Sequence, residues 1–109
     1  MAIQHIFLMQ FDPGLDSGDE AELRDRVETS SNAVGRMSDL RFAPVLLPER
    51  SQGYQYLASM VFATDADLKN YMVDNPIHHE LYEWLVARNC EFLVLDYDLD
   101  AAKALKQPV

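Results

Sequence analysis

The chain has 109 residues, a length typical of a single domain that is large enough to bury a hydrophobic core. Hydrophobic residues make up 49% of it and charged residues 25%, a composition that indicates a folded protein and excludes a disordered one. Acidic side chains outnumber basic ones by 18 to 9, and the net charge of −9 disfavours nucleic acid and anionic membranes as partners.

The N-terminal stretch MAIQHIFLMQF is apolar but lacks the cationic start of a signal peptide. No run reaches the roughly 18 apolar residues that a membrane span needs. The one cysteine, Cys90, cannot form an internal disulfide, which suits a reducing compartment. We therefore expect a soluble, cytoplasmic protein that contacts neither nucleic acid nor membrane.

The first predicted strand covers residues 3–11, where the side chains alternate with a period of two. Both of its faces carry apolar residues, so the strand should be largely covered on both sides. One face holds Ile3, His5, Phe7, Met9 and Phe11, and the other holds Gln4, Ile6, Leu8 and Gln10.

The turn segment DPGLDSGD separates this strand from a predicted helix. Ser17 followed by Glu20 is the pattern of a capping box at the start of a helix. We expect the helix to end within residues 35–39. Its apolar stripe would consist of Leu23, Val27, Val34 and Met37.

Two strands, two helices and a last strand should follow. The strands are predicted over residues 40–48 and 54–64, and Pro44 places the first of them at an edge of the sheet. Asp65 would cap a short helix.

Asn75 should cap a longer helix that has Pro76 at its first position and ends near Arg88. Residues 90–99 then form a strong last strand, and residues 100–109 form a loosely held tail.

The element order β-α-β-β-α(α)-β predicts an α+β, ferredoxin-like fold, in which a four-stranded antiparallel sheet carries its helices on one face. Residues 1–99 would form the domain and residues 100–109 the C-terminal tail. The strands are apolar on both faces, so the bare face needs a cover, and a second copy of the chain is the simplest one. We therefore expect a homodimer, a dimeric α+β barrel.

The stretch DNPIHHELYEW places two histidines side by side at the start of the longer helix. At about 100° per residue, His78 falls at the edge of an apolar arc, whereas His79 faces the other side with Glu83 and should be a surface residue. His78 lies in the first turn, where the helix dipole opposes protonation, and a half-buried neutral imidazole can act as a general base. The alternative is an imidazole that is only satisfied by a hydrogen bond at the edge of the domain.

Three further residues are candidates for a site. His5 lies in an apolar row and needs a polar partner. Asp96 is in phase with the apolar residues of the last strand; it could orient an imidazole, or it could simply begin the polar end of the strand. Tyr71 is either a core aromatic residue or a phenol that donates a hydrogen bond into a pocket.

No metal or cofactor is predicted. HHELYE resembles the start of a zinc-protease helix, but Glu83 replaces the second histidine, and adjacent histidines point about 100° apart. The glycines form no phosphate-binding motif, and the basic, aromatic surface of an RNA-recognition module is missing. Cys90 has no evident base near it, so a catalytic thiol is not expected.

The segment QGYQYLASMVFATDADLKNYMVDNPIHHELYEWL, followed by FLVLDYD, resembles the stress-responsive dimeric α/β-barrel (Dabb) family. The resemblance covers about residues 3–98, and the ordered set of motifs carries it rather than any single one. The matching residues are His5, Gly53–Tyr54, Phe62, Tyr71, Asn75–Pro76–Ile77–His78 and Asp96–Tyr97.

The resemblance implies a catalytic site like that of the olivetolic acid cyclase type of polyketide cyclase, which performs an intramolecular aldol condensation without metal or organic cofactor. By that resemblance His78 would be the general base, Tyr71 would orient or polarise the substrate carbonyl, His5 would line the pocket, and Asp96 would hold the His78 imidazole. The implied apolar wall consists of Phe7, Met9, Ala58, Met60, Leu68, Met72, Leu81, Phe92 and Val94.

Two departures from the cyclase stand out. This chain has one more residue between Tyr71 and Pro76. It also carries Leu23 and Val27 where the cyclase pocket has bulkier rings.

Three functions follow as expectations. The first is a homodimer that binds a hydrophobic, carbonyl-bearing small molecule and acts as a cofactor-free cyclase or isomerase. The second is a non-catalytic stress-response or ligand-binding protein, which the lack of a cavity of a few hundred cubic ångströms would favour. The third is a cofactor-free monooxygenase of the related dimeric barrels, disfavoured because its tryptophan–asparagine arrangement is not evident.

Overall fold

The structure, a computed structural model, describes residues 1–32, 37–103 and 105. It confirms the predicted α+β, ferredoxin-like fold with its β-α-β-β-α(α)-β order. Among the described residues, no helix has both the length and the apolar character needed to cross a membrane. The elements are β1 (Ile3–Phe11), α1 (Ser17–Asn32), β2 (Met37–Pro44), η1 (Pro48–Arg50), β3 (Tyr56–Phe62), α2 (Asp65–Lys69), η2 (Asn70–Asp74), α3 (Pro76–Ala87) and β4 (Cys90–Asp98).

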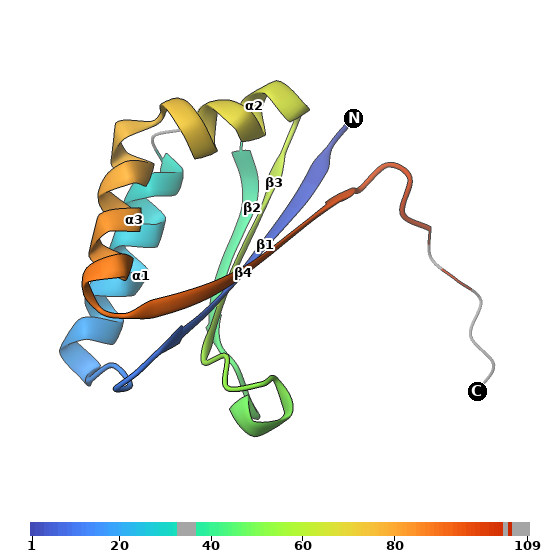
Figure 1. Cartoon of the computed structure of the whole chain (residues 1–109). Coiled ribbons are helices and arrows are strands. Elements are labelled where there is room, and N and C mark those ends of the chain that lie inside the picture. Colours follow the sequence, from blue (N-terminus) through green and yellow to red (C-terminus); the bar gives the residue numbers. More distant parts are fainter. Residues whose placement is uncertain (33–36, 104, 106–109) are drawn as a thin grey trace.

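The four strands form one antiparallel sheet in the order β2-β3-β1-β4. β1 is therefore hydrogen-bonded on both sides, and β2 and β4 are the edges. Pro44 ends the edge strand β2, in agreement with the predicted edge position. Figure 1 shows α1 and α3 side by side against one face of the sheet, while no described helix covers the opposite face.

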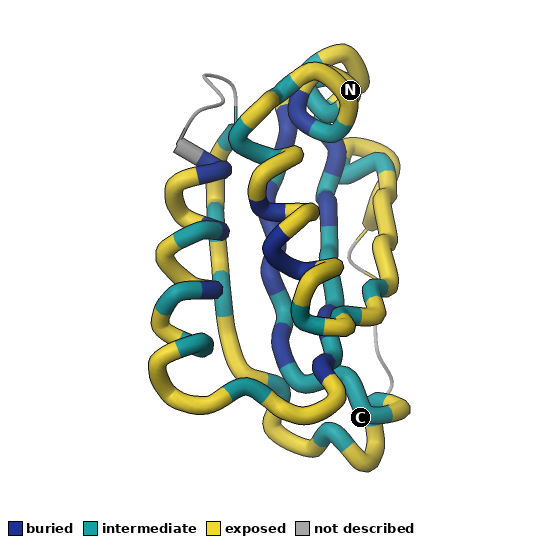
Figure 2. Tube along the Cα trace, turned by 60° about the vertical axis from the view of Figure 1, so that its left-hand side comes forward, coloured by how far each residue is buried: buried dark blue, intermediate teal, exposed yellow. Residues whose placement is uncertain are grey.

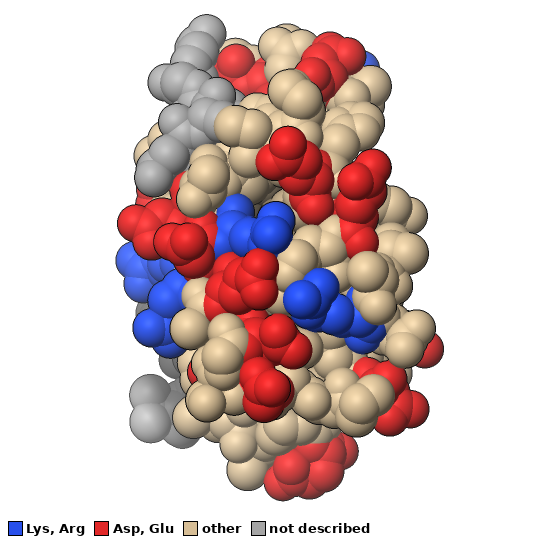
Figure 3. All heavy atoms as spheres, turned by 90° about the vertical axis from the view of Figure 1, so that its left-hand side faces the viewer, with Lys and Arg blue, Asp and Glu red and all other residues tan. Residues whose placement is uncertain are grey.

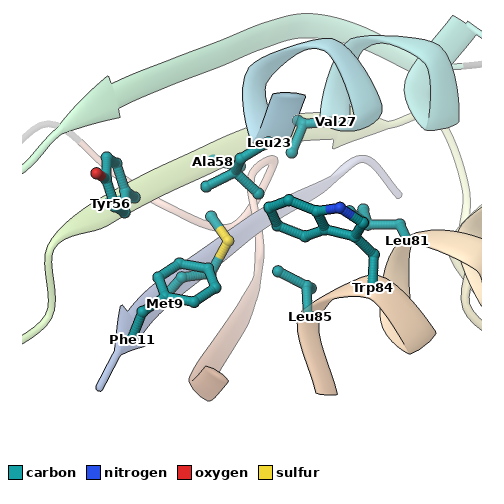
Figure 4. Packing of buried hydrophobic residues seen from close by; sticks show 9 residues of the cluster. All are labelled: Met9, Phe11, Leu23, Val27, Tyr56, Ala58, Leu81, Trp84 and Leu85. Atoms are coloured by element: carbon teal, nitrogen blue, oxygen red, sulfur yellow. The ribbon is translucent and has the colours of Figure 1, made fainter. Parts of the chain in front are cut away.

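The core lies between the sheet and the two long helices. Figure 2 shows buried residues on the sides of the strands and helices that face one another. The main cluster, drawn in Figure 4, consists of Met9, Phe11, Leu23, Val27, Tyr56, Ala58, Leu81, Trp84 and Leu85. A smaller cluster consists of Ile3, Met60, Phe62 and Tyr71.

Trp84 is covered on its outer side by two arginines. The guanidinium carbon of Arg88 lies 3.8 Å from the centroid of the indole, and that of Arg26 lies 5.6 Å from it. Arg26 also forms an ion pair of 3.0 Å with Glu22. Figure 3 shows acidic and basic side chains interspersed over this helical face. The arginines thus cover apolar surface and offset part of the acidic charge.

The face of the sheet opposite the helices, which we call the open face, is apolar. Ile6 and Leu8 of β1 lie on it and are half-buried. Leu93, Leu95 and Tyr97 of β4 flank them and are 51%, 56% and 40% exposed. A contiguous apolar row of this kind typically marks an interaction surface.

Two predicted helix caps are wrong by one residue. Asp16, not Ser17, caps α1, because its Oδ1 accepts the backbone N–H of Asp19 at 2.8 Å. Thr64, not Asp65, caps α2 through its side-chain oxygen. In both cases the polar side chain just before the helix accepts a free N–H group of the first turn. The residue predicted as the cap is therefore the first residue of the helix.

The boundary between α1 and β2 also differs from the prediction. α1 ends at Asn32, and β2 begins at Met37, which pairs with Phe62 instead of extending the helical stripe. A β-bulge between Ser38 and Arg41 lets this polar stretch join the ladder. Residues 33–36, with Val34 of the predicted stripe, lie outside the described residues, as do residues 104 and 106–109 of the predicted tail. β1, β3 and β4 lie within their predicted ranges.

Asn75 caps α3 as predicted, and its loss should weaken the fold. Its Oδ1 accepts the N–H groups of Ile77 and His78 at 2.9 and 3.1 Å. We expect Asn75→Ala to lower the free energy of unfolding by about 1 kcal/mol, measured by urea denaturation. Asn70→Ala at an exposed helical position is the matched control and should stay within about 0.5 kcal/mol of the wild type. Equal losses in the two variants would contradict the capping role.

Candidate functional site

A cavity of about 110 Å³ lies between the sheet and α3, where β1 meets β4. β1, the π-helical turn η2, α3 and β4 all contribute to its wall. It brings together three of the four residues that were predicted to be catalytic. The lining residues are His5, Phe7, Tyr71, Met72, His78, Leu81, Tyr82, Leu85, Phe92 and Val94.

Five residues of the predicted apolar wall line the cavity, namely Phe7, Met72, Leu81, Phe92 and Val94. The other predicted members do not: Met9 and Ala58 lie in the main core cluster, Met60 lies in the smaller one, and Leu68 packs against the smaller one.

The physical reason is position within the face of the sheet. Period two places Met9, Ala58 and Met60 on the correct face, but Ala58 and Met60 belong to β3, on the side of β1 away from β4, and Met9 lies further along β1 than His5 and Phe7, where it packs in the main core cluster. Two lining residues were missed as pocket residues, namely Tyr82 and Leu85. Their signal was present, because Leu85 belongs to the apolar arc of the helix and Tyr82 lies at its edge.

His5 and Asp96 form a hydrogen-bonded pair. They are directly opposite each other in the β1–β4 ladder, and Nδ1 of His5 lies 2.5 Å from Oδ1 of Asp96. His5 is 3% exposed, whereas the Asp96 side chain is 38% exposed. Asp96 therefore orients His5 and not His78, which corrects the partner that the resemblance implied. Because Nδ1 donates to the carboxylate, Nε2 is the ring nitrogen left for other partners.

His78 sits on the opposite wall, in the first turn of α3, and is half-buried. Burial lowers the pKa of His78 to about 4, and the nearby imidazoles of His79 and His5 add to this effect. His78 is therefore neutral at physiological pH. Its ring centroid lies 4.5 Å from that of Tyr71.

Tyr71 is a buried residue whose hydroxyl is already bonded. The phenol oxygen lies 3.1 Å from Oγ of Ser30 on α1, and the residue is 3% exposed. Burial raises the pKa of Tyr71, and hydrogen bonds from Ser30 and Ser31 oppose that rise. The ring contributes to the cavity wall while the hydroxyl is held by α1.

The π-helical turn positions this ring. η2 spans Asn70–Asp74, so it contains most of the segment between Tyr71 and Pro76 that is one residue longer than in the cyclase. A π-helical turn holds more residues than an α-helical turn, and such turns are frequent at functional sites. The longer segment therefore still leaves Tyr71 against His78.

The two adjacent histidines have separate surroundings. The rings of His78 and His79 are 6.3 Å apart and almost perpendicular. His79 is exposed as predicted, and its Nε2 donates to the carbonyl oxygen of Val73 at 2.6 Å rather than pairing with the predicted Glu83. Within the described part of the chain, no three His, Cys, Asp or Glu side chains are grouped to hold a metal ion.

Cys90 does not add a nucleophile to the site. Burial raises the pKa of its thiol to about 12, so the group stays protonated at neutral pH. A protonated thiol is a poor nucleophile, because thiol chemistry needs the thiolate.

Comparison with known proteins identifies relatives of the fold. The family model described as the stress-responsive A/B barrel domain matches residues 3–99. Comparison with curated protein sequences finds no match.

Three solved structures are similar to this one. A hydroxynitrile lyase from Passiflora edulis has a TM-score of 0.79 and 18% identity, over 94% of this chain and 97% of its own. A dimeric ferredoxin-like protein from Thermobifida fusca has a TM-score of 0.77 and 14% identity, over 91% and 92%. A Dabb family protein from Mesorhizobium loti has a TM-score of 0.71 and 21% identity, over 89% and 95%.

The low pKa of His78 can be measured directly. We expect the imidazole resonances of His78 to stay constant from pH 8 to about 5.5 and to shift only as the pH approaches about 4, as followed by NMR. Since the unfolded chain takes up this proton near pH 6.5 and the folded one does not, the contribution of His78 to stability is complete above pH 6.5 and is lost as the pH falls toward 4. A midpoint near 6.5 in the folded protein would contradict burial as the cause.

Proposed function

Because the chain belongs to the stress-responsive A/B barrel (Dabb) family, we propose that it is a homodimer that binds a small, apolar carbonyl compound and performs acid–base chemistry on it. The observation that carries this proposal is the pair of imidazoles on opposite walls of one apolar cavity. Their surroundings differ, since His5 is bonded to a carboxylate and His78 is held neutral by burial. Two titratable groups with such different surroundings suit a division of labour between proton acceptor and hydrogen-bonding partner.

The open face supports the homodimer. Its exposed leucines and tyrosine would be covered if a second open face packed against it, which would form a closed barrel-like pair. The similar structure from Thermobifida fusca is described as dimeric, and it has a comparable fold over 91% of this chain.

The size of the cavity limits the part of the ligand that it holds. An apolar cavity of roughly 150 Å³ can hold a benzene ring. At about 110 Å³, this cavity is smaller, and it falls below the few hundred cubic ångströms expected for a polyketide-sized substrate. The bound group is therefore a short, apolar unit that carries a carbonyl, without a phosphate or other charged group that would need an arginine or lysine in the wall.

We assign proton abstraction to His5. Nε2 of His5 would take a proton from the carbon next to the carbonyl, and the Asp96 carboxylate would stabilise the imidazolium that forms. The neutral ring of His78 is a weak base because of its lowered pKa, and its N–H would donate to the carbonyl oxygen, on which negative charge develops. Lyase chemistry on a similar fold, in the Passiflora edulis enzyme, supports a reaction of the aldol or lyase type.

Ligand binding without turnover is the second candidate. The hydroxyl of Tyr71, which the resemblance assigned to the substrate carbonyl, is bonded to Ser30 instead. This bond and the small volume of the cavity favour a binding protein over a cyclase.

The dimer can be tested with one leucine and one valine of nearly equal exposure. Leu93 on the open face is 51% exposed, and Val86 on α3 is 50% exposed. We expect Leu93→Lys to convert the dimer to a monomer, because the lysine places a charge in the centre of an apolar interface. Val86→Lys should remain dimeric. Multi-angle light scattering measures the mass, and the same mass for both variants would refute the open face as the interface.

Proton abstraction can be tested without knowledge of the natural substrate. We expect the protein to accelerate exchange of the α-protons of 2-butanone in D₂O, followed by proton NMR, beyond an equal concentration of free imidazole. Asp96→Asn and His78→Ala should each slow the exchange about tenfold or more. Asp98→Asn, on the same strand but outside the cavity, is the matched control. If the wild type shows binding shifts but no acceleration of exchange, the proposed catalysis is refuted, and ligand binding without turnover is the function that stands.

A further inference from the structure

A second hollow lies on the outer side of His78. It measures about 270 Å³ and is lined by Met72, His78, His79 and Tyr82. Met72, His78 and Tyr82 also line the inner cavity. Three of the four side chains around the outer hollow are thus the partition between the two spaces, and His78 can be approached from both sides.

The partition is built from adaptable side chains. Tyr82 is 51% exposed, and its ring rests on Phe92 with a centroid distance of 5.7 Å. A half-exposed aromatic side chain can change its rotamer rapidly. Met72 is half-buried and unbranched, and methionine side chains adjust to irregular ligands at low cost. Neither residue belongs to the main core cluster, and Met72 packs only at the margin of the smaller one as a half-buried side chain.

The volumes indicate why the two spaces belong together. The inner cavity of about 110 Å³ holds only a short group, whereas the outer hollow adds about 270 Å³ on the other side of the same imidazole. A ligand that places its carbonyl at His78 can direct one short substituent inward and a longer one outward. A longer substituent has no room on the inner side.

The charge around the outer hollow restricts which ligand substituent can lie in it. His79 also lines an adjoining depression that carries Asp74, Glu80 and Glu83. With these three carboxylates nearby and a net charge of −9, an anionic arm is disfavoured. Met72 and the Tyr82 ring offer apolar contact instead.

We propose that the inner cavity and the outer hollow form one elongated binding site for an uncharged ketone with a linear alkyl arm, and that Tyr82 determines the accepted length of that arm. This inference rests on the proposed carbonyl-binding function. The carbonyl lies at the His78 partition, the short end of the ligand lies inside, and the alkyl arm lies along Met72 and Tyr82.

A series of linear methyl ketones tests the proposal on the full-length chain. Dissociation constants for 2-butanone, 2-hexanone and 2-octanone are measured from the NMR shifts of the methionine methyl groups. We expect 2-octanone to bind at least about tenfold more tightly than 2-butanone, since four added methylenes gain partial burial. In Tyr82→Ala this ratio should fall to about threefold or less, whereas Tyr82→Phe, which keeps the ring, should retain it. Val86→Ala, on the same helix and 50% exposed in the wild type, serves as the control and should leave the ratio unchanged.

Three contrary results of the ketone series would each overturn one part of the proposed elongated site. A ratio near one in the wild type would mean that the outer hollow is not part of the site. A ratio that persists in Tyr82→Ala would remove Tyr82 as the residue that reads chain length. If 2-butanone itself gives no binding shifts, the carbonyl-binding function fails, and the elongated site fails with it.

Discussion

β1 is hydrogen-bonded to β3 on one side and to β4 on the other, and this double pairing determines where every other feature of the molecule lies. A strand held on both edges cannot rotate about its axis, so its period-two alternation assigns each side chain permanently to one face. His5 and Met9 are thereby committed to the helical side, and Ile6 and Leu8 to the open face. The core, the cavity and the proposed dimer interface are three consequences of one ladder.

The contrast between the two imidazoles arises from their supporting elements. His5 belongs to a central strand, and its cross-strand neighbour is a carboxylate with access to solvent. His78 belongs to the first turn of a helix, where burial and the nearby imidazoles of His79 and His5 oppose a positive charge and lower its pKa. The difference therefore comes from the Asp96 carboxylate beside His5 and from the burial of His78, and in each case the backbone element that carries the ring fixes these surroundings.

Much of the fold was predictable from local patterns, because alternation and helix capping act over a few residues. The strands β1, β3 and β4 and the Asn75–Pro76 start of α3 followed from such patterns. The start of β2 did not, because a bulge near Asp39 accommodates residues with no alternation of their own.

For the site, the sequence predicts on which face of a strand or helix a side chain lies, but not which side chains it contacts. Which imidazole Asp96 contacts depends on the register between β1 and β4, and that register is set across a separation of 91 residues. The same limit explains why Met9 and Met60 were placed in the wall, since a strand pattern indicates a face but not which part of that face borders the cavity. The bond from Ser30 to Tyr71 joins α1 to the π-helical turn, and nothing local in either segment indicates it.

The position of β4 has a consequence for how the protein is made. Ribosomes synthesise the chain from its N-terminus, so β1, which carries His5, is made before β4, its hydrogen-bonding partner on one side. Until then β1 is itself a sheet edge, with apolar side chains on both faces, which is the type of strand that pairs readily with other chains. A nascent chain that lacks β4 therefore exposes an edge that is prone to aggregation, and the cavity forms only when β4 has paired with β1.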